Sequence, residues 1–252
     1  MARVDSRPKR LYVEADLAGG TVVRADRKQS HYLLDVLRLA DNDTVLLFNG
    51  RDGEWQARLV TGPARSLGIE VVERTRKQDA AGNLDYLFAP LKHARLDYMV
   101  EKAVEMGASR LRPVLTRYTQ TQRVNLDRMR KNAIEAAEQC GTLRLPELVE
   151  PQPLATVLTS WEAERVLIFC DEAADPSDPV AALSGARTET LAGPMPIAVL
   201  VGPEGGFAPD ERAMLLKLPH AIRLSLGPRI LRADTAAVAA LALVQATLGD
   251  GR

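Results

Sequence analysis

The sequence predicts an α/β protein in which a layered domain with a parallel sheet follows a smaller β-rich domain. Residues 10–76 form short alternating runs separated by turn signals, as in antiparallel strands. Beyond residue 83, short apolar runs alternate with segments of helical period, which is typical of a sheet covered by helices. The polar stretch Lys77–Asn83 separates the two patterns. We therefore expect two domains, at residues 1–76 and 77–252.

The first domain is predicted to be a small β-barrel. Its expected strands cover residues 11–15, 21–25, 44–50, 54–60 and 67–73. Turn residues from Asn49 to Gly53 mark a tight reversal between two of these strands. One helix, Gln29–Leu39, interrupts the strands with a run of apolar positions.

The second domain contains four apolar runs, each short enough for a buried parallel strand. They are Tyr86–Pro90, Val166–Cys170, Ile197–Val201 and Ile222–Leu226. A helix is expected at Arg95–Met106, with Gly107 at the C-terminal cap position, and another from a cap at Asp127 to Cys140. The last helix, Ala236–Leu248, is apolar on nearly every side. It must lie in the core or against a second subunit.

Composition indicates an ordinary folded protein, with 46% hydrophobic and 26% charged residues. The basic N-terminus has no apolar run after it, so we expect neither a secretory signal nor a membrane anchor. Cys140 and Cys170 are not spaced as a disulfide framework, and the three histidines share no metal-ligand spacing. We expect a cytoplasmic protein without a metal.

Positive charge is concentrated in the first part of the chain. Residues 1–145 hold 25 basic against 19 acidic side chains, whereas residues 146–252 hold 8 against 14. Such asymmetry is compatible with a basic surface for RNA phosphates, although charged faces are more often only solvated. The basic candidates are Lys92, His93, Arg95, Lys102, Arg110, Arg112, Arg117, Arg123, Arg128, Arg130 and Lys131, with Tyr118 as a stacking ring.

Two glycine-containing segments each follow a predicted buried strand. They are GPEGGF at Gly202–Phe207 and GPRILRADT at Gly227–Thr235. Ligands of open α/β sheets bind at the carboxyl ends of the strands, so these segments are placed for a small-molecule site. Neither matches a phosphate-binding or dinucleotide pattern, and Glu204 would favour a positively charged ligand such as a sulfonium. The alternative is that Gly202–Gly206 only turns the chain into a helix.

Motifs along nearly the whole chain resemble the 16S rRNA uracil-N3 methyltransferases of the SPOUT superfamily. These motifs are HYLLDVLRL, FNG, KHARLDYMVEKAVEMGASRLRPV, EAAEQCG, LVGPEGGF and LSLGPRILRADTA. The chain departs from the family pattern at Cys140 and Thr142, and at Ala233–Asp234, where the family commonly has Thr-Glu.

The resemblance implies a PUA-like N-terminal barrel that binds RNA, a methyltransferase domain with a C-terminal trefoil knot, a homodimer and S-adenosylmethionine as cofactor. It also implies which residues line the cofactor site: Leu200, Gly202, Pro203, Gly205, Leu226, Gly227, Ile230 and Leu231. The expected RNA contacts are Lys92, Arg95, Lys102, Arg117 and Arg123.

Methylation at N3 requires a deprotonated, aligned nitrogen and no covalent nucleophile, so both cysteines are interpreted as ordinary residues. Arg232 is the candidate for stabilising the uracil anion, and a salt bridge to Asp234 or Glu204 is its structural alternative. Glu204 or Asp234 can serve as the base, but Asp234 is expected to cap the final helix. The sequence does not identify the base.

Two other functions remain open at this point. The chain can be a SPOUT methyltransferase acting on another RNA, such as a ribose hydroxyl of transfer RNA. It can also be a noncatalytic RNA-binding or ribosome-assembly protein, although the intact glycine segments argue against the loss of a methyl-donor site. A nucleotide-binding α/β enzyme is disfavoured by the absence of phosphate signals.

Overall fold

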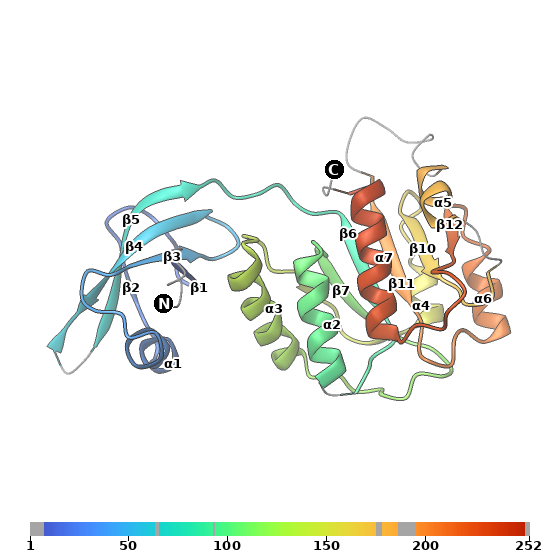
Figure 1. Ribbon diagram of the computed structural model, residues 1–252, viewed down its shortest axis with the longest axis horizontal. Coiled ribbons are helices and arrows are strands. Elements are labelled where there is room, and N and C mark those ends of the chain that lie inside the picture. The colour runs from blue at the N-terminus through green and yellow to red at the C-terminus, as the bar shows by residue number, and fades with distance from the viewer. Residues whose placement is uncertain (1–7, 64–65, 93, 175–177, 186–194, 250–252) are drawn as a thin grey trace. The chain divides into compact units, whose positions relative to one another are not determined.

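The computed structural model describes residues 8–63, 66–92, 94–174, 178–185 and 195–249 of the chain (Figure 1). The chain forms two compact units. Unit 1 consists of Met1–Ala80 and Ala137–Leu145, and unit 2 consists of Ala81–Ala136 and Pro146–Arg252.

Unit 1 is built on one five-stranded sheet with the order β1-β3-β4-β5-β2, in which only the β1–β3 pair is parallel. Alternate residues of these strands, such as Val45, Leu47 and Leu59, point into an apolar core and are fully buried. The predicted β-rich unit is therefore confirmed. Its strands are β1 (Lys9–Tyr12), β2 (Val22–Arg24), β3 (Thr44–Phe48), β4 (Glu54–Thr61) and β5 (Leu67–Arg76).

The helix of unit 1 begins earlier than predicted and changes from an α-helix to a π-helix along its length. Helix α1 covers Arg27–His31 and continues into a π-helical turn at Tyr32–Val36. Asp26 starts the helix through a capping box: its carboxylate accepts the Gln29 N–H at 2.7 Å, and the Gln29 side chain accepts the Asp26 N–H at 3.0 Å. This box places the start two residues before the expected one.

The last turn of α3 (Leu126–Cys140) belongs to unit 1 because β1 binds its exposed carbonyls. The Arg10 guanidinium donates to the carbonyls of Ala137 and Thr142, pairs with Glu54 at 2.8 Å and lies over the Phe48 ring. The final carbonyls of a helix have no partner within the helix, so a guanidinium can satisfy several of them. The EAAEQCG segment is thus fixed to the sheet of unit 1.

Unit 2 contains a parallel sheet with the order β12-β10-β11-β6-β7-β8, and β9 pairs with β7. The predicted parallel sheet is confirmed, and β10 and β11 have the expected bounds. Three strands were not predicted: the two-residue β8 and β9, and β7, whose sequence RLRPVL carries two arginines and a proline. Its strands are β6 (Leu84–Phe88), β7 (Arg110–Leu115), β8 (Glu147–Leu148), β9 (Gln152–Pro153), β10 (Val166–Cys170), β11 (Ile197–Val201) and β12 (Ala221–Leu224).

The helices of unit 2 pack in two groups: α2 and α5 against α7, which also contacts β11, and α4 against α6 and β7. Within the described ranges, no helix is long and apolar enough to cross a membrane. The cap of α3 is Asn125, which accepts the Arg128 N–H at 2.9 Å, so the expected cap at Asp127 is wrong by two residues. The helices are α2 (Ala94–Glu105), α4 (Leu154–Thr159), α5 (Pro179–Gly185), α6 (Pro209–Leu215) and α7 (Ala233–Thr247).

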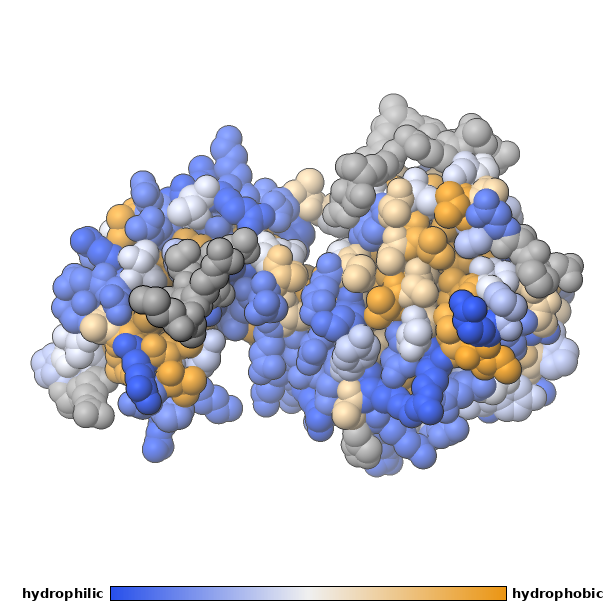
Figure 2. All heavy atoms as spheres, in the orientation of Figure 1, coloured by the Kyte–Doolittle hydropathy of each residue, from blue (hydrophilic) through white to orange (hydrophobic). Residues whose placement is uncertain are grey.

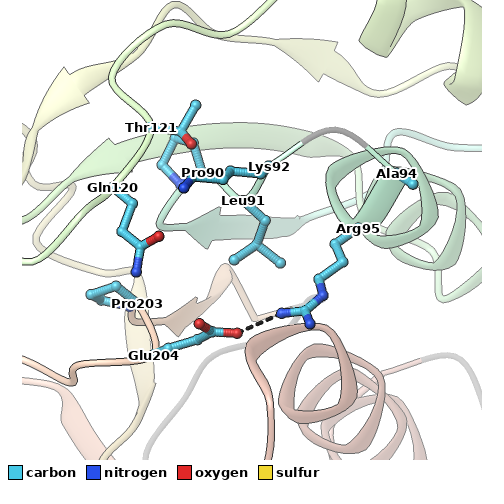
Figure 3. A pocket seen from close by; sticks show the side chains of 9 residues that line it. All are labelled: Pro90, Leu91, Lys92, Ala94, Arg95, Gln120, Thr121, Pro203 and Glu204. Atoms are coloured by element: carbon cyan, nitrogen blue, oxygen red, sulfur yellow. Dashed lines mark hydrogen bonds and ion pairs between the residues drawn. The ribbon is translucent and has the colours of Figure 1, made fainter.

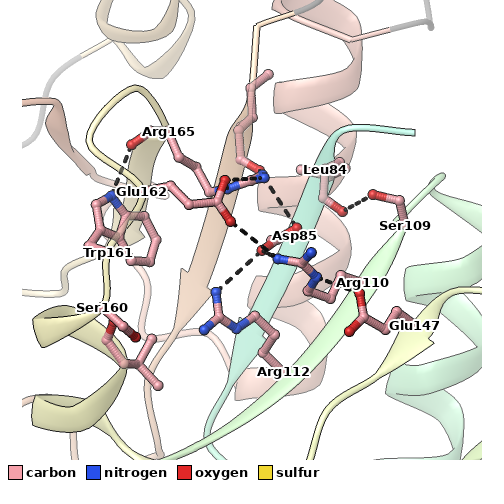
Figure 4. A network of polar contacts seen from close by, with 12 residues as sticks. Leu84, Asp85, Ser109, Arg110, Arg112, Glu147, Ser160, Trp161, Glu162 and Arg165 are labelled. Carbon is pink, nitrogen blue, oxygen red and sulfur yellow. Dashed lines mark hydrogen bonds and ion pairs between the residues drawn. The ribbon is translucent and has the colours of Figure 1, made fainter. Parts of the chain in front are cut away.

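A buried carboxylate organises the amino ends of the central strands (Figure 4). Asp85, at the start of β6, is 2% exposed and lies within 3.4 Å of guanidinium nitrogens of Arg110, Arg112 and Arg165. Burial raises the pKa of Asp85, while the three arginines act in the opposite direction. Arg110 also pairs with Glu147 at 2.9 Å. The assignment of Arg110 and Arg112 to a free RNA-binding cluster is therefore wrong, because both hold the sheet together.

We expect Asp85→Ala to lower the free energy of unfolding by about 3 kcal/mol, because it removes the buried carboxylate shared by three arginines and leaves the buried Arg165 with only the half-exposed Glu162. Urea denaturation of the full chain measures this change. Asp79→Ala is the matched control, since Asp79 is half-exposed and pairs with Arg76 at 3.6 Å. Its loss should stay below about 1 kcal/mol. Equal losses for the two variants would contradict a structural role for the buried network.

Candidate active site

The main cavity of unit 2 lies at the carboxyl ends of three neighbouring parallel strands. Segments that follow β10, β11 and β12, together with the start of α7, enclose about 590 Å³, within the range of small-molecule sites. We call it the glycine-loop cavity. Its lining comes from residues 170–174, 201–206, 224–231, 233 and 236, without residue 173.

Seven of the eight expected cofactor residues line this cavity: Gly202, Pro203, Gly205, Leu226, Gly227, Ile230 and Leu231. The eighth, Leu200, lies inside β11 and is fully buried in the core among apolar side chains. Ile230 has the opposite surroundings, since 95% of its surface is exposed at the cavity. The structure thus brings the two glycine segments together, as their positions after strands predicted.

Backbone conformation explains why glycine occurs in these segments. Gly206 has φ +69° and Gly227 has φ +95°, a region that side chains with a Cβ avoid. A Cβ on Gly202 would lie 2.9 Å from the Phe207 ring, which is itself packed against Phe169. The first segment therefore turns sharply over its own aromatic residue. The second leaves open space at Gly227, where an added Cβ would meet no atom within 4 Å.

Asp171 anchors the walls of the glycine-loop cavity. Its side chain is completely buried and pairs with Arg212 of α6 at 2.9 Å and with Arg223 of β12 at 3.0 Å. Arg223 also donates to the carbonyl of Ala173 at 2.9 Å. Sequence reasoning missed this residue, although an Asp-Glu pair directly after a buried strand is a signal that could have identified it.

The rim of the cavity is acidic. Glu172 and Glu204 line it with about half of each side chain exposed, and Arg229 is the one cation in its described lining. Behind the lining, Arg212 lies between Asp171 and Glu172, Arg223 pairs with Asp171, and Arg95 pairs with Glu204. The lining itself offers a ligand three carboxylates and one cation, which is compatible with a ligand that carries positive charge.

Cys170 ends β10 and borders the cavity, but its thiol is not poised for attack. Burial raises its pKa to about 12, so the thiol stays protonated at neutral pH. Within the described residues, no group of three or more His, Cys, Asp and Glu side chains could hold a metal ion.

A second cavity of about 420 Å³ adjoins the first and shares Pro203 and Glu204 with it. We call it the lateral cavity (Figure 3). The Arg95 side chain extends from α2 to the Glu204 carboxylate, where the two form an ion pair of 2.6 Å. The other lining residues are Pro90, Leu91, Lys92, Ala94, Gln120 and Thr121.

The expected RNA-binding residues do not form one group. Lys92 and Arg95 line the lateral cavity, and Arg123 is exposed in the segment between β7 and α3. Lys102 pairs with Glu105 at 2.7 Å, and this hydrogen bond raises the pKa of Lys102. Arg117 pairs with Asp210 at 2.8 Å. Arg128, a further candidate, pairs with Asp97. His93 lies outside the described residues.

Arg232 occupies the N-cap position of α7, and its side chain is exposed. Glu204 pairs with Arg95. The Glu204–Arg232 ion pair, one of the two structural alternatives for Arg232, is therefore not formed. Asp234 was expected to cap α7 but lies in its first turn, where it accepts the Thr235 N–H at 2.8 Å. A carboxylate there still favours the positive end of the helix.

A parallel α/β sheet with a glycine-walled cavity at its carboxyl edge, next to a separate β-rich unit in the chain, is typical of the α/β proteins that bind a small-molecule ligand. Comparison with known families identifies the class more closely. An RNA methyltransferase domain matches residues 78–245, and an RNA methyltransferase PUA domain matches residues 25–70. The chain belongs to this family of RNA methyltransferases.

Several known proteins are similar to this chain over almost its full length. "Ribosomal RNA small subunit methyltransferase E" of Rickettsia conorii is 30% identical over 94% of both chains. The protein of that name from Synechocystis is 29% identical over 95% of this chain and 78% of its own. The crystal structure of the Neisseria gonorrhoeae protein of that name, bound to S-adenosyl methionine, has a TM-score of 0.84 and 25% identity. It covers 98% of this chain and all of its own.

We expect Gly227→Ala to weaken S-adenosylmethionine binding at least about 10-fold, because Gly227 lines the cavity and an added Cβ would take up space that the ligand needs. Gly141→Ala is the control, since Gly141 has φ +89° and equally open surroundings but lies outside the cavity. Calorimetric titration measures both affinities. Equal affinities for the two variants would place the ligand elsewhere.

Proposed function

We propose that the protein transfers a methyl group from S-adenosylmethionine to N3 of a uridine in 16S rRNA of the small ribosomal subunit. The observation that carries this proposal is the glycine-loop cavity, in which the GPEGGF and GPRILRADT segments face one space at the carboxyl ends of parallel strands. The names of the relatives and the cofactor-bound Neisseria structure support methylation of small-subunit ribosomal RNA with S-adenosylmethionine.

The residues of the cavity fit S-adenosylmethionine. Glycines at 202, 205 and 227 let the backbone approach a ligand closely, and the carboxylates of Glu172 and Glu204 suit a cation. Leu226 and Leu231, with Pro203, supply apolar surface for a flat ring. When bound, the cofactor supplies an electrophilic methyl carbon on a positively charged sulfur, and the bond pair from that carbon remains with the sulfur.

The protein must accept the N3 proton and stabilise the charge that its loss leaves on the uracil. In this proposal the Glu204 carboxylate takes the proton, and the N3 electron pair then forms the new bond to the methyl carbon. The exposed Arg232 belongs to the second glycine segment, between the cavity-lining Leu231 and Ala233, and its guanidinium stabilises the negative charge on the uracil oxygens. The protonated thiol of Cys170 takes no part.

The proposed enzyme has two domains and acts as a homodimer. Residues 1–76 form an RNA-binding domain and residues 77–252 the methyltransferase domain, with the knotted C-terminal path that the family resemblance implies. A homodimer is supported by the second face of α7, which carries the partly exposed Val238, Ala239 and Leu243. Figure 2 shows apolar side chains gathered over this helix. The enzyme would act in the cytoplasm, where ribosomal subunits assemble.

The test is transfer of a labelled methyl group from S-adenosylmethionine to small subunits from cells that lack the gene, followed by nucleoside mass analysis. We expect 3-methyluridine in 16S rRNA. A different methylated nucleoside, or label only in another RNA, would move the enzyme to another target. Absence of cofactor binding would favour a noncatalytic RNA-binding protein.

We expect Arg232→Ala to leave S-adenosylmethionine affinity within about 2-fold and to lower kcat at least about 100-fold, because its charge is needed only as the uracil becomes anionic. Calorimetry and single-turnover transfer to small subunits give the two values. Lys217→Ala, an exposed cation outside both cavities, is the control. A parallel loss of affinity and rate would assign Arg232 to cofactor binding.

A further inference from the structure

We infer that the lateral cavity is the pocket for the acceptor base, and that Gln120 and Thr121 position its uracil ring. This inference rests on the proposed function and extends it to a second site, with residues that the sequence motifs did not indicate. Methyl transfer needs two ligands in contact, and the glycine-loop and lateral cavities have a common wall.

The position of the lateral cavity follows from the sheet. β11 lies beside β6, and β6 beside β7, all parallel, so the segments after these strands meet at the same edge. Pro90–Lys92 follow β6, Gln120 and Thr121 lie in the segment after β7, and Pro203–Glu204 follow β11. The lateral cavity therefore continues the glycine-loop cavity along the carboxyl edge.

The lining of the glycine-loop cavity is more negative than that of the lateral cavity, which matches a cationic methyl donor in the first and a nucleotide in the second. The glycine-loop cavity presents Glu172 and Glu204 to a sulfonium, whereas the lateral cavity combines Lys92 and Arg95 with one carboxylate. A uridine nucleotide brings a negative phosphate and a neutral base that becomes anionic during transfer. Such a ligand is favoured by the cations of the lateral cavity and disfavoured by the acidic rim of its neighbour.

The shape and polar groups of the lateral cavity suit a pyrimidine. Pro90, Leu91 and Pro203 offer apolar surface for the faces of a ring, while an amide and a hydroxyl lie at one side (Figure 3). An amide N–H and a hydroxyl can donate to uracil O2 or O4, the atoms that carry the charge when N3 loses its proton. A cavity of about 420 Å³ admits a single nucleotide drawn out of a stack.

Glu204 belongs to both cavities and is the point at which they communicate. Its partner Arg95 holds it at 2.6 Å, but both side chains are more than 40% exposed. Exposed pairs of this kind contribute at most about 1 kcal/mol, so an incoming phosphate can replace the carboxylate as the partner of Arg95. The exchange releases Glu204 beside the base, where the proposed proton transfer takes place.

The experiment uses the full-length protein with two pairs of variants. Gln120→Ala removes a donor from the cavity, and Thr121→Trp fills the cavity with a large ring. Gln122→Ala and Gln122→Trp are matched controls, because Gln122 is exposed, two residues from Gln120 and outside both cavities. Each variant is measured for S-adenosylmethionine affinity, thermal unfolding, and kcat and KM for methyl transfer to small subunits.

We expect Gln120→Ala to lower kcat at least about 10-fold, and Thr121→Trp to abolish transfer, while both keep cofactor affinity within about 2-fold. The Gln122 variants should retain full transfer. Undiminished transfer by Thr121→Trp would overturn the inference, and so would loss of cofactor affinity in a folded variant, which would make the lateral cavity part of the donor site. Failure of the unsubstituted protein to form 3-methyluridine would instead reject the proposed function.

Discussion

The buried carboxylate of Asp171 holds together the segments that form the glycine-loop cavity. It lies directly after β10 and binds Arg212 of α6 and Arg223 of β12, two residues far from it in the chain. Removing this buried charge would take away the ion pair of Arg223 and leave Arg212 with the half-exposed Glu172 at 3.5 Å, which is more costly than losing a surface pair. The Asp171 N–H also donates to the carbonyl of Leu224, so backbone and side chain fix the same neighbours. The shape of the site depends on this one residue.

Parallel pairing of the central strands places two cavities side by side, as a transferase with two ligands requires. Because the central strands share one direction, every segment that follows them emerges at the carboxyl edge of the sheet. Glu204 and Pro203 thereby form a wall between two cavities rather than the end of one. The opposite edge stabilises the fold, because the ion pairs of Asp85 join β6 to β7 and to Arg165, just before β10. Stability and ligand binding are thus separated at the two ends of the same strands.

The sequence predicted the elements whose signals are local. Apolar runs located β10 and β11, and the glycines after the sheet located most of the lining of the main cavity. β7 was hidden because Arg110 and Arg112 occupy its polar face, where they reach a carboxylate on the neighbouring strand. Gln120 and Thr121 were missed for the same reason, since their position at the carboxyl edge follows from β7. Ion pairs between distant segments, such as those of Asp171 with Arg212 and Arg223, produce no periodic pattern in a single sequence, so they could not be predicted.

Four of the arginines that were candidates for RNA binding are paired with carboxylates of the protein. Arg110 and Arg112 are committed to Asp85, Arg117 pairs with Asp210, and Arg128 pairs with Asp97. Phosphate contacts by the remaining cations would position RNA without distinguishing one nucleotide from another. Under the proposed function, selection of a uridine must therefore come from the cavity that receives the base. Lys92 and Arg95 line that cavity together with Gln120 and Thr121. The cations that attract the RNA phosphates therefore lie beside the polar groups that hydrogen-bond to the base.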